Sequence, residues 1–237
     1  MEDRKTMTIA EALGGNDYPG RGILIGFSGG KAVTAYFIMG RSENSRNRVF
    51  RLQEGILRTE PFDEAKVQDP SLIIYNAVRT YERHLIVTNG NQTDTICDAL
   101  REGKSFTDAL DTRTFEPDAP NFTPRISGCV TFGKDSFSYQ LGILKSADSL
   151  GSRTVREYYD YLPESGKAHL IHTYEKNGTP LPPFEGAPKA VKIPADIDEL
   201  TDEVWGSLDE ANKISLYVRY VDLTDGTYES RLINKYE

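Results

Sequence analysis

Short apolar runs separated by turn residues dominate the chain. Residues 22–27 and 32–39 are two runs of strand length, joined by the turn Ser28-Gly29-Gly30-Lys31. Because glycine readily adopts the positive φ that tight hairpin turns need, this segment predicts a β-hairpin. Further strands are expected at 49–57, 71–79, 84–88, 125–132, 137–144, 154–161, 167–174, 214–223 and 228–236. The run 71–79 also fits a helix, and we favour the strand.

Turn signals indicate how some of these runs pair. We expect 154–161 to pair with 167–174 across the turn at 163–166. The last two runs are expected to close the chain as a hairpin around Asp225-Gly226. The sequence therefore predicts antiparallel sheets.

Helical periodicity is confined to a few segments. We expect helices at 93–102 and 106–110, a short helix before Gly14-Gly15, and a loop over the proline-rich segment 177–188. The clearest helix is 196–212, whose apolar stripe is Ile197, Leu200, Val204, Leu208 and Ala211. Hairpins in series with helices set apart predict an α+β fold with stacked antiparallel sheets. Without an internal repeat or a low-complexity linker, we expect a single domain over 1–237.

Charge and composition narrow the function classes. The formal net charge of −8 argues against a nucleic-acid binder, which is usually basic over at least one domain. No apolar run approaches the length of about 20 residues that spans a bilayer, and 1–12 lacks the apolar core of a secretory signal. We therefore expect a cytoplasmic protein that binds neither membrane nor nucleic acid. Two cysteines and three histidines form no zinc-binding pattern, so no metal is expected.

The densest polar feature lies at 40–48, with the sequence Gly-Arg-Ser-Glu-Asn-Ser-Arg-Asn-Arg. Planar guanidinium groups can bond two phosphate oxygens at once, and asparagine offers both a donor and an acceptor. A solvated hairpin turn is the alternative interpretation of such a polar loop. The absence of lysine and the single acid, Glu43, favour an anion-binding loop.

Three further polar clusters stand out. Residues 88–94 follow a predicted strand and open a predicted helix, so they fit an anion site and a capped turn equally well. The segment 116–127 combines an acid, an amide, a hydroxyl and an arginine, and taken alone it is better explained as a proline-stiffened surface loop. In 73–79, Tyr75 stands beside an asparagine and an arginine, although a buried tyrosine usually only satisfies its own hydroxyl. None of these stretches contains a phosphate-loop, nucleophile-elbow or dinucleotide-binding motif.

The order of these clusters is more informative than any one of them. The motifs are Tyr18-Pro-Gly-Arg21, Ala35-Tyr36 before Gly40-Arg41-Ser42 and Asn47-Arg48, Tyr75-Asn76-Ala-Val-Arg79, Thr88-Asn-Gly-Asn91 with Thr93-Asp94-Thr95, and Asn121-Phe-Thr-Pro-Arg125-Ile. This series resembles the archaeal-type IMP cyclohydrolase family. The resemblance covers residues 18–175, and the C-terminal third departs from it more.

The resemblance implies a fold like that of the N-terminal nucleophile hydrolases. This fold is a four-layer αββα sandwich, with two antiparallel sheets stacked between helices. True N-terminal nucleophile enzymes expose a cysteine, serine or threonine by self-cleavage. The matching first strand begins near Tyr18-Pro19-Gly20-Arg21, without such a residue. We therefore expect the fold without its usual hydrolysis.

The resemblance also implies a reaction, the ring closure of 5-formamidoimidazole-4-carboxamide ribotide to IMP with loss of water. Arg41 and Tyr75 would then donate hydrogen bonds to the reacting oxygen, and Glu116 would act as acid or base on the carboxamide. Phosphate is assigned to Arg21, Arg48 and Arg125, and the carboxamide, imidazole or ribose to Asn47, Asn76, Asn89 and Asn91. The other expected binding residues are Ser42, Arg79, Asp94, Asn121 and Thr123.

This chemistry needs neither a metal nor an organic cofactor, and the expected partner is a small purine ribotide. A homo-oligomer is compatible with the sequence. Two other classes stay open at this point: a purine nucleotide-binding protein without catalysis, and an amidohydrolase that keeps an N-terminal nucleophile.

Overall fold

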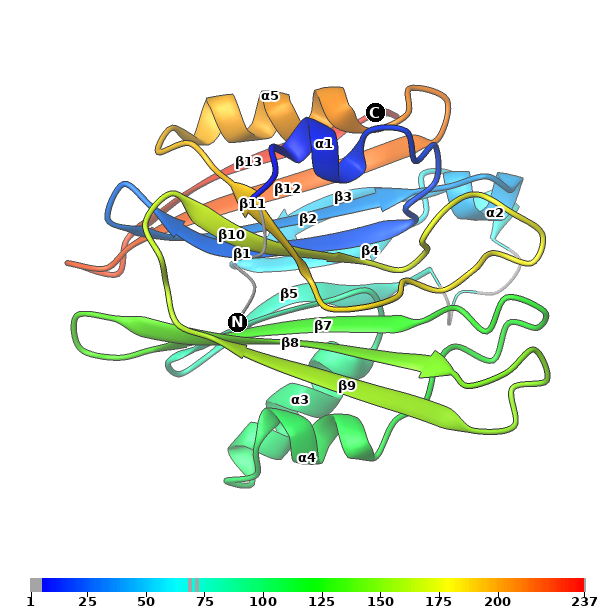
Figure 1. Cartoon of the computed structure of the whole chain (residues 1–237), viewed down its shortest axis with the longest axis horizontal. Coiled ribbons are helices and arrows are strands. Elements are labelled where there is room, and N and C mark those ends of the chain that lie inside the picture. The colour runs from blue at the N-terminus through cyan, green and yellow to red at the C-terminus, as the bar shows by residue number, and fades with distance from the viewer. Residues whose placement is uncertain (1–5, 68–69, 71–72, 237) are drawn as a thin grey trace.

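Two antiparallel sheets pack face to face in the computed structural model, which describes residues 6–67, 70 and 73–236 (Figure 1). The six-stranded sheet has the order β11-β10-β1-β2-β12-β13. Its strands are β1 (Arg21–Ser28), β2 (Lys31–Met39), β10 (Lys167–His172), β11 (Lys189–Lys192), β12 (Lys213–Asp222) and β13 (Tyr228–Asn234).

The seven-stranded sheet follows the chain, in the order β3-β4-β5-β6-β7-β8-β9. Its strands are β3 (Val49–Gln53), β4 (Ile56–Glu60), β5 (Tyr75–Tyr81), β6 (His84–Thr88), β7 (Arg125–Phe132), β8 (Phe137–Ser146) and β9 (Thr154–Tyr161).

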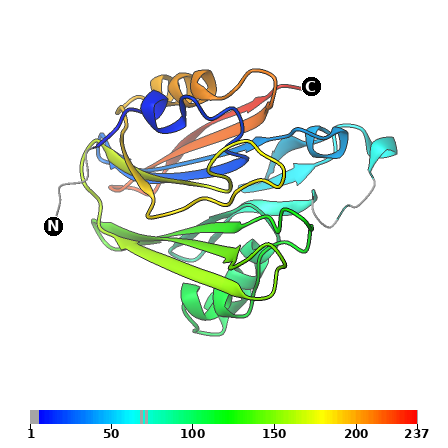
Figure 2. The same cartoon turned by 45° about the vertical axis from the view of Figure 1, so that its right-hand side comes forward.

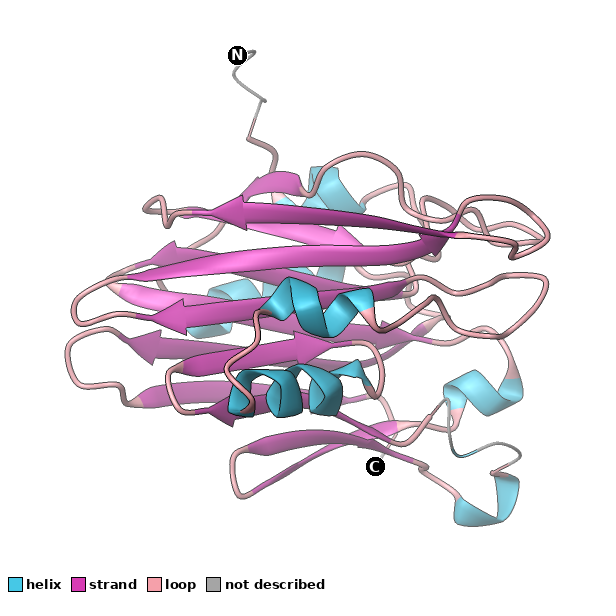
Figure 3. Cartoon of the chain, turned by 90° about the horizontal axis from the view of Figure 1, so that it is seen from below, coloured by secondary structure: helices cyan, strands magenta, loops and turns pink. Residues whose placement is uncertain are grey.

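Helices cover the outer face of each sheet. Helices α1 (Ile9–Leu13) and α5 (Ile197–Ser207) lie on the six-stranded sheet (Figure 1), and α3 (Gln92–Arg101) and α4 (Phe106–Asp111) lie on the seven-stranded sheet (Figure 3). The short helix α2 (Glu43–Arg46) lies at one end of the sandwich (Figures 1 and 2). A 3-10 turn, Glu64–Lys66, completes the helical segments of the described residues. The expected α+β fold with two antiparallel sheets is confirmed.

Three apolar clusters correspond to these layers. Side chains alternate across a strand, so one run can serve two cores. On β2, Tyr36 and Ile38 pack between the sheets, whereas Val33, Ala35 and Phe37 pack beneath α1 and α5. This double burial explains why β2 is an unbroken apolar run instead of an alternating one.

Several hairpins are confirmed, one expected strand is divided in two, and one expected pairing is wrong. The turns at Ser28-Lys31 and Asp225-Gly226 join antiparallel neighbours as expected. The segment 49–57, expected as one strand, is interrupted at Glu54-Gly55, where both residues have positive φ and the chain turns from β3 into β4. The segment 154–161 does not pair with 167–174: β9 pairs with β8, whereas β10 pairs with β1 and β11. The proline-containing connection between them therefore crosses from one sheet to the other.

Smaller differences concern helix ends and loops. The polar segment 40–48 is not all loop, because Ser42 caps α2 within it. The last helix ends at Ser207 instead of 212, so Ala211 lies outside its stripe. Strand β11 pairs at the edge of its sheet but carries no clear sequence signal. The first two residues of the expected strand 71–79 lie outside the described residues.

No helix in the described part of the chain combines the length and apolar character needed to cross a bilayer.

Candidate functional site

A polar cavity of about 250 Å³ opens near the α2 end of the sandwich. Its walls come from the first residue of β1 and from the segments before β1, β3, β5, β7 and β11. Its lining residues are Tyr18, Arg21, Arg41, Ser42, Asn44, Ser45, Arg48, Ile73, Glu116, Asp118, Asn121, Thr123, Tyr174 and Leu181.

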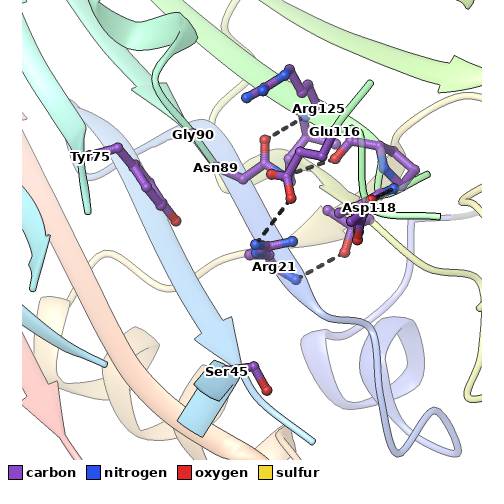
Figure 4. Close-up of polar contacts among 12 residues, drawn as sticks. Arg21, Ser45, Tyr75, Asn89, Gly90, Glu116, Asp118 and Arg125 are labelled. Carbon is purple, nitrogen blue, oxygen red and sulfur yellow. Dashed lines mark hydrogen bonds and ion pairs between the residues drawn. The ribbon is translucent and has the colours of Figure 1, made fainter. Parts of the chain in front are cut away.

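Arg21 and Glu116 form the central ion pair of this cavity. Arg21 Nη2 lies 3.5 Å from Glu116 Oε2, and the two side chains are only 11% and 4% exposed (Figure 4). Gly20 makes this placement possible: it has φ 81°, and a Cβ there would lie 2.2 Å from Thr173 Oγ1. That same hydroxyl accepts a hydrogen bond from the Arg21 backbone N–H. The close packing of Gly20 against Thr173 thus directs the first side chain of β1 into the cavity.

Burial changes the proton affinity of Glu116. Removal from water raises the pKa of this carboxyl above its usual range, although Arg21 and Arg125 oppose the shift. Burial is the largest single effect on Arg21 and acts against its charge. Glu116 and three nearby tyrosines together outweigh it, so the pKa of Arg21 lies well above its ordinary value. The cavity thus holds a fixed cation beside a carboxyl whose pKa is shifted toward neutral pH, as suits a group that exchanges protons.

A chain of hydroxyl groups lies along another wall. Tyr174 Oη lies 2.6 Å from Thr123 Oγ1, and the Thr123 hydroxyl donates to Asp118 Oδ2. Asp118 Oδ1 also accepts from the Thr123 backbone N–H at 2.6 Å. These contacts fix the loop before β7, so that Glu116 is held against Arg21.

Three polar atoms of the lining are buried without a partner among the described residues. They are Arg21 Nε, Arg48 Nη1 and Asn44 Oδ1. Arg48 is only 2% exposed, and its other nitrogens donate to the Ser45 and Met39 carbonyl oxygens at 2.8 Å. Buried polar groups are nearly always hydrogen-bonded, so these atoms mark positions where a bound molecule or ordered water completes the site.

Arg41 forms one side of the cavity. Its Nη1 donates to the Gly178 carbonyl oxygen at 2.9 Å and to Asn177 Oδ1, and its guanidinium lies over the ring of Tyr18, 4.9 Å from the centroid. Tyr18 in turn stacks on Tyr174 with ring centroids 5.8 Å apart. This column ties the loop after β10 to the cavity.

Tyr75 lies behind the lining. Its hydroxyl is 2.8 Å from the hydroxyl of Tyr36 on the facing sheet, and it points toward Arg21 (Figure 4). Arg125 also lies behind the wall, where Nη1 donates to Gln92 Oε1 at 2.8 Å. Burial lowers the pKa of Arg125, and Glu116 acts in the opposite direction.

The structure brings together part of the expected site. Of the residues singled out from the sequence, seven line the cavity: Arg21, Arg41, Ser42, Arg48, Glu116, Asn121 and Thr123. Ser42 and Asn121 also have structural partners, as do Arg41, Arg48 and Thr123: the Ser42 side chain caps α2, and Asn121 Oδ1 accepts from the Leu181 backbone N–H.

Asn76, Arg79 and Asp94 form a separate cluster against α3. Asp94 Oδ1 lies 3.0 Å from Asn76 Nδ2 and 2.5 Å from Arg79 Nη1. A register shift between β4 and β5 leaves Ala77 without a partner. Such a bulge moves the next side chains to the other face, which lets residues three apart in a strand meet the same helix. These three residues do not line the cavity.

The remaining expected residues are also held elsewhere. Asn89 is buried and joins β6 to β7 through the Pro124 carbonyl oxygen and the Ile126 N–H. Asn47 makes paired bonds with the backbone of Asp63, and Asn91 accepts from Arg113. These contacts stabilise loops and lie outside the cavity lining.

Sequence reasoning did not single out half of the lining as site residues. Asp118 and Asn44 lie within the polar clusters 116–127 and 40–48, and Tyr18 begins the motif Tyr18-Pro-Gly-Arg21. The segments of these three residues were therefore indicated by the sequence, although the residues themselves were not. Tyr174 and Leu181 were not indicated, because they lie in the loop after β10, which reaches the cavity only through the pairing of β10 with β1.

The fold and the cavity define an α+β protein with a polar, arginine-rich pocket. Comparison with known sequences is more specific. The chain belongs to the family described as IMP cyclohydrolase-like protein, whose sequence model matches residues 18–226.

Several similar proteins carry the name IMP cyclohydrolase. The protein from Thermococcus kodakarensis is 30% identical over 190 residues, which are 79% of this chain and 86% of the relative. The one from Methanosphaera stadtmanae is 35% identical over 165 residues, 68% and 75% of the two chains. The one from Haloarcula marismortui is 34% identical over 151 residues, 61% and 70%.

Proposed function

We propose that this protein is an IMP cyclohydrolase, an enzyme that closes 5-formamidoimidazole-4-carboxamide ribotide to IMP with loss of water. The observation that carries the proposal is the buried Arg21–Glu116 pair in a cavity that also presents unpartnered polar atoms. Family membership and the names of the relatives support it. The proposed reaction is a step of purine biosynthesis.

The reaction can be written with balanced atoms. The carboxamide nitrogen forms a bond to the formyl carbon and loses one proton. The formyl oxygen gains that proton and becomes a hydroxyl group. It then leaves with the proton of the formamide nitrogen, so that a C–O bond breaks and water is released.

Glu116 is proposed to carry the proton between these steps. Its raised pKa suits a carboxyl that accepts a proton from the carboxamide nitrogen and delivers it to the formyl oxygen. In the second step the same carboxyl can pass the proton of the formamide nitrogen to the departing hydroxyl. Arg21, which sequence reasoning assigned to phosphate, is proposed instead to orient Glu116 and to stabilise its charge. Holding the two reacting groups in contact supplies a large further share of the rate, because ring closure is sensitive to position.

Two donors are proposed for the formyl oxygen. Tyr75, whose hydroxyl lies 2.8 Å from that of Tyr36 and points toward Arg21 from behind the lining, is proposed to donate a hydrogen bond to this oxygen. Arg41 is held by Asn177 and Gly178, so its guanidinium is fixed before the substrate arrives. Donors that are fixed in advance stabilise the developing oxyanion most effectively.

The phosphate is proposed to bind near Arg48, whose buried Nη1 has no acceptor among the described residues. Asn44 Oδ1 is an acceptor for a ribose hydroxyl or an amide N–H. Arg125 contributes positive charge from behind Glu116. The expected roles of Asn47, Asn76, Asn89 and Asn91 in binding substrate are not part of this proposal, because those residues bond to protein groups outside the lining.

The fold is proposed to be of the N-terminal nucleophile hydrolase type, as one domain over 1–237, in a cytoplasmic enzyme. The stacked antiparallel sheets with helices outside support this assignment. In place of a nucleophile, β1 begins with Arg21, whose side chain lies beside Glu116. An intact-mass measurement that finds an exposed cysteine, serine or threonine after self-cleavage would contradict the proposed chemistry.

The direct test is an absorbance assay for IMP formation from the formylated ribotide by purified protein, without added metal. We expect turnover in the wild type and a loss of about 100-fold or more in Glu116→Gln. Glu157→Gln, outside the cavity, is the matched control and should keep the activity. A folded wild type that binds IMP but forms none would indicate a nucleotide-binding protein without catalysis.

A further inference from the structure

A second buried arginine lies in the six-stranded sheet, away from the candidate site. Arg219 on β12 is only 6% exposed, and its Nε and Nη1 atoms have no acceptor among the described residues. Arg21 and Arg48 share this feature, and both line the cavity described above. Because an unpaired buried charge is costly, the same feature at Arg219 points to an acceptor that the chain itself does not supply.

The orientation of Arg219 is fixed by an aromatic ring. Its guanidinium carbon lies 3.5 Å from the ring centroid of Tyr228 on the neighbouring strand β13. Stacking of this kind occupies the flat face of the guanidinium. The ring does not cover the edge of the guanidinium, where Nε and Nη1 have no acceptor among the described residues. The N–H groups along this edge are the ones that bond to the two oxygens of an oxyanion.

Arg219 lines a second cavity, of about 390 Å³. The cavity lies among the turns β5–β6, β7–β8 and β12–β13, at the end of the sandwich opposite α2 (Figure 1). Its size is within the range of pockets for small organic ligands. The ten residues of β12 separate the two ends by about 30 Å, so this cavity is distinct from the first.

The lining combines three cationic and three acidic side chains with an apolar floor. Arg83 and Lys134 stand at the exposed rim, whereas Leu85 and Phe132 contribute apolar surface. Two acids of the β12–β13 turn form hydrogen bonds within that turn. Asp222 accepts from the Thr224 N–H, and Asp225 accepts from the Thr227 N–H, both at 2.8 Å. A third acid, Glu82, also lines the cavity.

We propose that this cavity is a second ligand site that binds a small organic anion. An oxyanion group, carboxylate or phosphate, bonds to the in-plane N–H groups of Arg219, and the apolar part of the ligand rests on Leu85 and Phe132. The site does not depend on the reaction proposed above, because none of its lining residues belongs to the first cavity.

The test follows the Nε–H resonance of Arg219 by NMR in the full-length ¹⁵N-labelled protein. This resonance is assigned by correlating it with the backbone resonances of Arg219. The probes are phenyl phosphate and, separately, inorganic phosphate. We expect a saturable shift with both, and tighter binding of phenyl phosphate because its ring covers the apolar floor. A resonance that neither probe moves would overturn the proposal, and so would a shift that never saturates, which indicates an adventitious ion only.

Two variants make the test specific. Lys134→Gln at the exposed rim should weaken phenyl phosphate binding about two- to fivefold. Arg231→Gln removes the same charge from β13, but Arg231 pairs with Asp198 on α5, so the affinity should not change. Equal weakening by both variants would show a general charge effect in place of a site. Because both positions lie outside the buried core, neither change is expected to prevent folding.

Discussion

Arg21 and Glu116 are held 3.5 Å apart in a cavity where both side chains are almost completely buried. Arg21 comes from the start of β1, and Glu116 comes from the loop before β7, so each sheet is linked to one partner of the pair. A buried pair of this kind contributes little to stability, because the loss of water around both charges offsets their attraction. The pair is therefore better explained by chemistry than by stability.

The raised pKa of Glu116 predicts the acidic limb of the pH profile. If the ionised carboxyl is the base, kcat/KM rises with pH as Glu116 loses its proton, with a midpoint above the ordinary value of about 4.3. The sign follows from burial, which favours the protonated form. Steady-state rates between pH 4.5 and 8.5 test this. A midpoint at or below the ordinary value would contradict the role of Glu116 as the buried base.

Tyr75→Phe should lower kcat on the order of 100-fold, because it removes one fixed donor to the developing oxyanion. The ring stays, so the apolar core between the sheets is preserved. Tyr158→Phe is the matched control, since its hydroxyl donates to Asp111 outside the cavity. Circular dichroism checks that both variants fold, and steady-state rates measure their turnover. Near-normal turnover in folded Tyr75→Phe would remove this hydroxyl from the mechanism.

Asp94→Asn should leave kcat and KM unchanged, although the residue stands in a motif that resembles the enzyme family. Asp94 bonds to Asn76 and Arg79 beneath α3, outside the cavity. Because Asp94 is partly exposed, the free energy of unfolding should fall by no more than about 1 kcal/mol. Denaturant unfolding and steady-state kinetics measure the two effects. A large rise in KM would place Asp94 back in the binding site.

His172 predicts a pH-dependent stability. Burial lowers the pKa of this imidazole to about 3, and its Nδ1 is 2.9 Å from the Tyr174 carbonyl oxygen. Above about pH 6.5 the folded and unfolded states are both neutral at this position. Below that value the unfolded state takes up a proton and the folded state does not, so stability is lost as the pH falls toward 3.

The variant His172→Asn isolates this effect. When the pH falls from 7.5 to 5, the free energy of unfolding of this variant should rise by about 2 kcal/mol relative to that of the wild type. The reason is that only the wild type has a histidine at this position that takes up a proton on unfolding. Urea unfolding at the two pH values gives the difference. An unchanged difference would show that His172 takes up a proton in the folded state as readily as in the unfolded state.

Local patterns predicted most of the fold. Apolar runs and glycine turns predicted the hairpins β1–β2 and β12–β13 because both signals lie within a few residues of each other. The pairing of β10 with β1 could not be predicted, since it joins residues about 150 positions apart and no local signal selects a partner sheet. The expected pairing of 154–161 with 167–174 was wrong for the same reason. Proline and glycine are common in a short turn and in a crossover between sheets, so they do not distinguish the two.

The site shows a similar division. Arg41 and Arg48 were identified because arginine and asparagine gather at 40–48, whereas Arg21 and Glu116 were assigned through the resemblance to the family. Asn76 and Asp94 carry the same chemistry, yet a bulge at Ala77 turns Asn76 toward α3. Polarity thus indicates which residues need partners, but only the register determines whether these are substrate or protein.

The crossover from β9 to β10 has a consequence for folding. It places Tyr174 and Leu181 beside Arg21 and Glu116, so the first cavity is complete only when the two sheets have docked. Contacts between distant parts of a chain form late, because closing long loops costs entropy before the contacts form. Binding competence should therefore return with the slowest phase of refolding, and a ligand of this cavity should slow global unfolding.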